Sequence, residues 1–146
     1  MNFKIRKFNK DDKSEVLRMM EEFYHSDAVS TNGSNEIYET DFENCINDLP
    51  FLDGYVFVSE DIILGYAMIA KSFSTEFGKM CIWLEDLYLK KEYRGQSIIP
   101  QFLEYIKETN PNTLFKLEVE KKNSHAVHVY QKCGFSKLPY LEMMFI

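Results

Sequence analysis

Cysteine is scarce in this 146-residue chain, and the three that occur, Cys45, Cys81 and Cys133, show no metal-ligand spacing. We therefore expect free thiols in a reducing compartment. The first residues, MNFKIRKF, lack the apolar core of a signal peptide, and no apolar run approaches membrane-spanning length. These absences predict a cytoplasmic protein without a membrane partner.

Positive charge is also in short supply, because 17 Lys and Arg stand against 23 Asp and Glu, for a net charge of −6. Binding to nucleic acid needs basic patches, so we expect no nucleic-acid partner. An acidic surface suits a cationic substrate instead. The chain has no linker, internal repeat or low-complexity segment, and its length fits one domain, residues 1–146.

Hydrophobic periodicity predicts strands and helices in mixed order, which indicates an α/β (α+β) domain. Helices are expected after Asn9 or Asp11, over residues 36–48, after Ser97 and after Asn123 or Ser124. Strand patterns occupy seven segments, at residues 2–8, 54–59, 62–72, 80–89, 114–120, 135–137 and 141–146.

Two acids, Glu85 and Asp86, interrupt the otherwise apolar segment 80–89. A buried strand does not accept carboxylates without a reason, and neighbours on a strand face opposite sides. Only one of the two can therefore face a given cleft. The plainer interpretation is that either acid lies at a strand end and contacts solvent.

A charged turn and a glycine separate segment 80–89 from the helix that follows it. Backbone N–H groups at the start of a helix attract phosphate, so this turn is a candidate phosphate site. Pro100 is tolerated in a first helical turn, although it removes one N–H donor. The candidate residues are Arg94, Gly95, Gln96, Ser97, Ile98, Ile99 and Pro100.

The segment LEDLYLKKEYRGQS, Leu84 to Ser97, resembles the GNAT acyltransferase superfamily and is most similar to the LED-hydrophobic-YRG form of diamine acetyltransferases. Ser97 and Ile99 depart from the usual phosphate turn, where a glycine and a small residue are common. The resemblance extends over most of the chain and also involves Phe3 to Arg6, Asp11, Asp12, Asn123, Ala126, Tyr130, Gly134 and Phe135.

The resemblance implies a GNAT-like fold with about four helices around a mostly antiparallel sheet of about six or seven strands. The sheet is expected to splay between its fourth and fifth strands, where the pantetheine arm of coenzyme A pairs with backbone groups. In this chain Leu87 and Leu89 would offer those groups. Asn123 and Ala126 would also contact the cofactor, although Asn123 equally suits a helix cap.

The resemblance further makes Glu85 the base, through water, and Tyr130 the acid that protonates the leaving thiolate. Asp86 is then structural. Helical spacing alone favours a core role for Tyr130. His125 and His128 have no third ligand nearby, so no metal is expected. Four aromatic residues either line an acceptor pocket or belong to the core: Tyr24, Tyr38, Trp83 and Tyr88.

The implied function is an N-acetyltransferase that moves an acetyl group from acetyl-CoA to a primary amine of a small molecule, with polyamines among the candidates. One alternative is a catalytically weak module of the same fold that binds CoA or acyl-CoA; the altered turn motivates it. Another is a protein N-terminal or lysine acetyltransferase. A nucleotide-binding protein is disfavoured, because G-x-G-x-x-G and G-K-[ST] are lacking. The sequence leaves a homodimer open.

Overall fold

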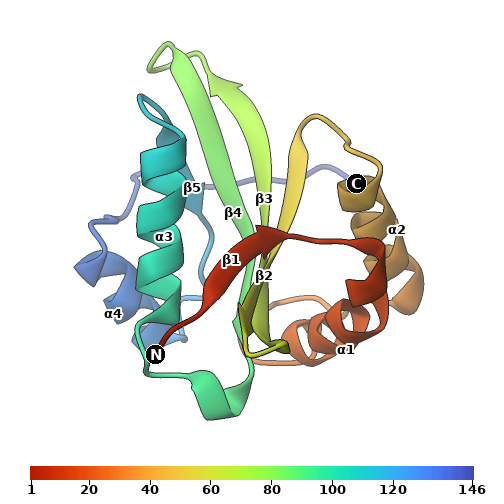
Figure 1. Ribbon diagram of the computed structural model, residues 1–146. Coiled ribbons are helices and arrows are strands. Elements are labelled where there is room, and N and C mark those ends of the chain that lie inside the picture. Colours follow the sequence, from red (N-terminus) through yellow and green to blue (C-terminus); the bar gives the residue numbers. More distant parts are fainter.

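Five strands form one sheet, in the order β1-β2-β3-β4-β5, in the computed structural model, which describes residues 1–146 (Figure 1). Neighbours from β1 to β4 pair antiparallel, and β5 pairs parallel with β4. The predicted α/β class and mostly antiparallel sheet are confirmed. The strands are β1 (Lys4–Lys7), β2 (Leu52–Ser59), β3 (Ile62–Ser74), β4 (Lys79–Leu89) and β5 (Leu114–Leu117).

Four α-helices cover the sheet, with α1 and α2 on one face and α3 and α4 on the other (Figure 1). Two short 3-10 helices, η1 (Lys10–Asp12) and η2 (Lys91–Tyr93), precede α1 and α3. No helix is long and apolar enough to cross a membrane. The helices are α1 (Lys13–Tyr24), α2 (Asn35–Ile46), α3 (Ile98–Thr109) and α4 (Ser124–Lys132).

Apolar residues at helical spacing decide which face each helix buries. In α1, Val16, Met20 and Phe23 are buried beneath the sheet face that α2 also covers. In α3, Phe102 and Ile106 are buried in the core of the opposite face. The sheet therefore separates two apolar clusters, and a side chain on β4 belongs to one or the other according to its position.

The carboxyl-terminal part of the sheet is smaller than the sequence predicted. Segments 135–137 and 141–146 are not strands, so the count of six or seven is wrong, and the strand expected over 114–120 ends at Leu117. β5 pairs with β4 only as far as Leu84 and Leu117, and a strand without a partner cannot satisfy its backbone groups. The last residues are exposed and do not pair with any strand.

Two irregularities shape β4. The pairing with β5 ends at Leu84, whereas β4 runs on to Leu89, so the sheet opens where the resemblance implied a splay. On its other side β4 stays paired with β3 and approaches Gly65 closely. A Cβ atom at Gly65 would lie 2.2 Å from the Tyr88 carbonyl oxygen, so only glycine allows this approach.

Candidate active site

The opening between β4 and β5 exposes backbone groups of β4 beyond Leu84. Lys90 N donates to Leu64 O at 2.9 Å, which makes these two residues a hydrogen-bonded pair across β3 and β4. Hydrogen-bonded and non-hydrogen-bonded pairs alternate along an antiparallel ladder. The N–H and C=O groups of Leu87 and Leu89 therefore point away from β3, toward the opening. An extended ligand can pair with groups in this orientation.

A β-bulge separates the two adjacent carboxylates. Met68 pairs with Asp86 and Ile69 pairs with Leu84, so Glu85 has no residue opposite it on β3. Asp86 is 1% exposed, whereas the Glu85 side chain is exposed. The two acids therefore differ in exposure, but the bulge interrupts the regular alternation on which the expectation of opposite faces depended. Glu85 is the one whose side chain solvent or a substrate can reach.

Asp86 is held by two tyrosine hydroxyl groups. Tyr24, the last residue of α1, donates to Oδ1 at 2.8 Å, and Tyr66 on β3 donates to Oδ2 at 2.7 Å. Burial raises the pKa of Asp86 to about 7, against the lowering effect of these hydrogen bonds, and the charges of Asp41 and Glu85 raise it further. Asp86 thus fastens the end of α1 to the strand that carries Glu85.

Acidic residues from three other elements gather near Glu85. Partial burial, and then the negative charges of Asp41 on α2 and Glu142 near the carboxyl terminus, raise the pKa of Glu85. A hydrogen bond with Glu142, burial and the charges of Glu142 and Glu85 raise the pKa of Glu118 to about 7. A carboxylate with a raised pKa is a stronger base, and the group as a whole attracts cations.

The turn between η2 and α3 adopts left-handed backbone conformations at two residues. Gly95 has φ of 78°, and a Cβ atom there would meet nothing within 4 Å, which leaves open space at the turn. Ser97 has φ of 61° and is the N-cap residue of α3, but its side chain makes no cap hydrogen bond. Ser97 occupies a conformation that favours glycine. This explains why glycine is usual at this position in the family that the turn segment resembles.

The remaining turn residues divide between the core and the surface. Ile98, the first residue of α3, is buried in the core, Ile99 and Pro100 are half-buried, and Gln96 is exposed. Because Pro100 has no N–H group, the amides of residues 98 and 99 are the donors that the start of α3 can offer. Their role in phosphate binding remains a prediction.

Arg94 makes two contacts within the protein. Its Nε atom donates to Leu89 O at 2.9 Å, and its guanidinium carbon lies 5.7 Å from the centroid of the Tyr88 ring. The Leu89 carbonyl is therefore already bonded, which leaves the Leu89 N–H and both groups of Leu87. Arg94 also borders a hollow of about 480 Å³, whose lining includes the cations Arg18, Lys90 and Lys91.

Helix α4 presents the remaining predicted residues. Asn123 caps it, because the Asn123 side chain accepts a hydrogen bond from Ala126 N at 3.3 Å. The Ala126 N–H is thus engaged within the protein. Tyr130 is partly buried against the α3 core, 6.1 Å from the Phe135 ring centroid, and burial and then Cys133 raise its pKa to about 12. The Tyr130 hydroxyl therefore stays protonated at neutral pH.

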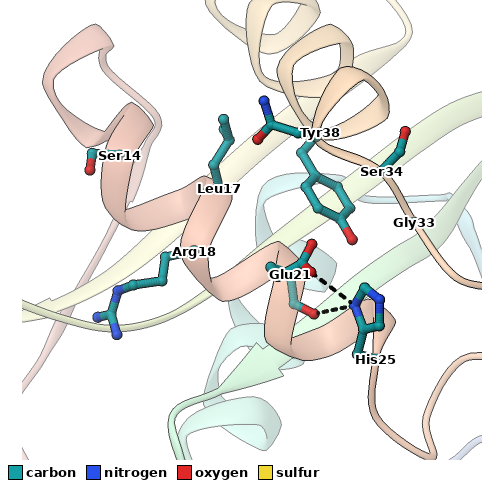
Figure 2. A pocket seen from close by; sticks show the side chains of 9 residues that line it. Ser14, Leu17, Arg18, Glu21, His25, Gly33, Ser34 and Tyr38 are labelled. Carbon is teal, nitrogen blue, oxygen red and sulfur yellow. Dashed lines mark hydrogen bonds and ion pairs between the residues drawn. The ribbon is translucent and has the colours of Figure 1, made fainter.

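Of the four aromatic residues proposed for an acceptor pocket, Tyr24 and Tyr38 pack together, with ring centroids 5.7 Å apart, whereas Trp83 and Tyr88 contact other side chains. Tyr24 bonds to Asp86, Trp83 lies beneath Lys116, and Tyr88 bonds to Glu22. Tyr38 borders a separate hollow of about 660 Å³ between α1 and α2, where Glu21 and His25 contact each other (Figure 2). No β4 residue lines that hollow, so it is distinct from the opening beside Glu85.

Three residues near Glu85 were missing from the sequence prediction, namely Asp41, Glu118 and Glu142. No motif marks them, and only the folded chain brings them together. The structure contains no group of three or more His, Cys, Asp or Glu side chains that could hold a metal ion.

Comparison with known proteins matches residues 17–135 to the family described as the Acetyltransferase (GNAT) family. Thialysine N-epsilon-acetyltransferase of Mus musculus is 26% identical over 150 residues, which cover 92% of this chain and 85% of that protein. The Sus scrofa protein of the same name is 34% identical over 83 residues, which cover 55% of this chain and 48% of that protein.

Solved structures show the same fold at low identity. A possible acetyltransferase from Clostridium difficile 630 has a TM-score of 0.82 at 18% identity, over 100% of this chain and 98% of that chain. AAC(6')-Iy in complex with the bisubstrate analogue CoA-S-monomethyl-acetylneamine has a TM-score of 0.81 at 12% identity, over 100% and 99% of the two chains.

Replacement of Asp86 by Asn should change how stability depends on pH. The folded pKa of about 7 lies above the unfolded value of about 4. Between these values the folded state binds more protons, so this residue lowers the unfolding free energy as pH rises. Asp86→Asn should remove that fall. Between the two pKa values, its unfolding free energy should therefore gain a few kcal/mol on that of wild type, at about 1.4 kcal/mol per pH unit.

Urea unfolding from pH 4 to 8 would measure this difference, with Asp27→Asn at an exposed loop position as the control. Repacking around the new side chain would shift the unfolding free energy by the same amount at every pH and would leave its slope against pH unchanged. Parallel curves for wild type and Asp86→Asn would contradict the prediction.

Replacement of Ser97 by Gly should stabilise the turn. Glycine removes the strain of a left-handed conformation at φ of 61°, but it also gives the unfolded chain more entropy. With both effects counted, the free energy of unfolding should rise by about 0.5–1 kcal/mol. Ser14→Gly, within α1, is the matched control and should lose about 0.5–1 kcal/mol. Denaturant unfolding would compare them, and equal losses in both variants would sink the idea.

Proposed function

Because the chain belongs to the GNAT family of acetyltransferases, we propose that it transfers an acetyl group from acetyl-CoA to a primary amine of a small molecule. A diamine, a polyamine or an amino acid with a side-chain amine is the favoured acceptor. The observation that carries this proposal is the exposed Glu85 carboxylate beside the opening between β4 and β5. The name of the thialysine acetyltransferase relatives supports an amine at the end of a short chain.

The residues around the opening fit the cofactor. Leu87 and the Leu89 N–H point into the opening, where they would pair with the pantetheine arm. Open space at Gly95 and the free amides at the start of α3 suit a pyrophosphate, and the cations around Arg94 suit further phosphate. Acetyl-CoA would supply an activated thioester. Asn123 would contact it through its side-chain amide, because its oxygen caps α4.

Glu85 is the base in this proposal. An amine that is protonated at neutral pH must lose a proton before it attacks a thioester. The raised pKa of Glu85 increases its basicity, and its exposed side chain leaves room for one water between carboxylate and amine. The ionised fraction of Glu85 increases as pH rises through its pKa, so activity should increase in the same direction.

Tyr130 is the acid in this proposal. Its hydroxyl group makes no hydrogen bond within the protein, and its pKa of about 12 keeps the proton in place until a thiolate develops nearby. The ring packs against the α3 core, which fixes the direction of the hydroxyl. The core position that helical spacing favoured and the catalytic role are therefore compatible.

The acceptor is proposed to be cationic because of the charges around Glu85. Asp41, Glu118 and Glu142 add carboxylates near Glu85. A second ammonium group would be attracted there. A weak CoA-binding module remains the second candidate, since Ser97 holds a strained turn and Pro100 removes a donor. We place the protein in the cytoplasm as an expectation from its sequence.

Incubation with labelled acetyl-CoA and a panel of monoamines, diamines, lysine and thialysine tests the function. Glu85→Gln should lower kcat for every amine by roughly 10²- to 10⁴-fold and remove the rise of rate with pH. Glu104→Gln, which removes an exposed carboxylate from α3, should behave as wild type.

Three other outcomes are informative. A raised KM for diamines alone would make Glu85 a charge clamp rather than a base. An unchanged pH–rate profile with both amine classes would remove Glu85 from the chemistry. CoA binding without transfer to any amine would establish the binding module instead.

Tyr130→Phe removes one hydroxyl group and leaves the ring packing in place. If the hydroxyl protonates the thiolate, kcat should fall by roughly 10²- to 10⁴-fold while CoA affinity is nearly kept. Single-turnover kinetics and calorimetry with CoA would separate the two quantities. Full turnover in this variant would assign Tyr130 to the core alone.

A further inference from the structure

Lys116 on β5 carries a positive charge that no carboxylate of the protein neutralises. Its ammonium nitrogen lies 5.6 Å from the centroid of the Trp83 ring, which belongs to the residue opposite it on β4. Lys116 is half-buried, yet it takes part in none of the ion pairs of the protein. A cation that has lost part of its water needs a partner, and the ring supplies only part of what an anion would.

The Lys116 side chain lies on the sheet face that α1 and α2 cover (Figure 1). Its strand neighbours Phe115 and Leu117 pack against the α3 core, and side chains alternate along a strand, so Lys116 points to the other face. Trp83 lies on that face as well, because its neighbour Leu84 belongs to the α3 core. The cation and its aromatic support therefore share one face of the sheet.

The acidic residues described above lie on the same face. Glu85 is close enough to Asp41 on α2 and to Tyr24 at the end of α1 for its charge to act on both. Glu118 follows β5 directly, and its carboxyl group interacts with Glu142 and Glu85. Negative charge therefore surrounds the end of β5 on the side where Lys116 points.

The spacing of these charges suits one small molecule. Two residues along an extended chain span at most roughly 7 Å, which separates Lys116 from Glu118 on one strand and Trp83 from Glu85 on the next. An amino acid with a side-chain amine carries a carboxylate and an ammonium group on one carbon and a second ammonium group at the end of a short chain. A diamine has two positive ends and would leave Lys116 without a partner.

We propose that Lys116 is a specificity-determining residue that pairs with the α-carboxylate of an amino acid whose side-chain amine reaches Glu85. This inference rests on the proposed function, because it names which of the amine acceptors that function uses. Glu118 would hold the α-ammonium group, and the Trp83 ring keeps the Lys116 ammonium in place. A site with a partly buried cation discriminates against an acceptor that lacks the carboxylate.

Lysine and cadaverine, which is lysine without its carboxylate, together isolate the group that Lys116 is proposed to bind. The wild type should favour lysine in kcat/KM by roughly tenfold or more. Lys116→Met keeps an unbranched stem over Trp83 and removes the charge, so KM for lysine should rise by roughly 10- to 100-fold while KM for cadaverine is unchanged or falls. Lys116→Arg should retain most of the preference. Lys121→Met, which removes an exposed lysine from the segment after β5, should behave as wild type.

Calorimetry in the presence of CoA measures the same preference without turnover, so failure of this inference is separate from failure of the proposed function. The Kd values of lysine and cadaverine should follow the pattern of the KM values. Lysine binding that depends on Lys116, without transfer to any amine, would contradict the proposed function alone.

Four results would overturn the role of Lys116. They are equal losses for both acceptors in Lys116→Met, an unchanged Kd for lysine in that variant, a wild type that prefers cadaverine, and a lack of lysine binding whether or not other amines are acetylated. Equal losses for both acceptors would leave Lys116 with a structural role on Trp83.

Discussion

The hydrogen bonding between β4 and β5 stops at Leu84 and Leu117, and the rest of the candidate site depends on this limit. Every backbone group in a strand needs a partner, so the point where pairing ends decides which groups a ligand can use. On the edge of β4 that pairs with β3, the Lys90–Leu64 hydrogen bond determines which residues bond to β3. Leu87 is not one of them, so its N–H and C=O groups point toward the opening. β5 itself also ends at Leu117, the last of its residues that pairs with β4.

The bulge at Glu85 solves a second problem, the placement of two carboxylates next to each other. Without it the two acids would lie in regular pairing on opposite faces of β4. With it Glu85 leaves the ladder, and Asp86 enters the core beside two hydroxyl donors. A buried carboxyl group without such donors would be strongly unfavourable. The hydroxyl groups also join α1, β3 and β4 at one point.

The sequence predicted the fold well where patterns are local. Periodicity located all four helices, and the residues from Leu84 to Ser97 indicated the strand, turn and helix that carry the candidate site. It failed at the carboxyl terminus, because residues 141–146 have the composition of a strand but strand formation depends on a partner that composition does not reveal.

The candidate site was predicted in part for a similar reason. Glu85 and Asp86 stood out as acids in an apolar strand, but no local pattern announced the bulge that interrupts the alternation of their side chains. The approach of Asp41 and Glu142 depends on how distant segments pack, and the engagement of the Leu89 carbonyl by Arg94 depends on side-chain conformation. Neither property leaves a mark on the sequence around Glu85.

The contact between Gly65 and Tyr88 has a consequence for how this protein tolerates mutation. Any side chain at position 65 would meet the Tyr88 carbonyl oxygen and displace the end of β4 from β3. Leu89 would move with it, and the opening beside β5 would become narrower. Position 65 therefore acts as a spacer for the site although it lies on the neighbouring strand and contacts no ligand. Mutational tolerance at this position should follow side-chain volume rather than polarity.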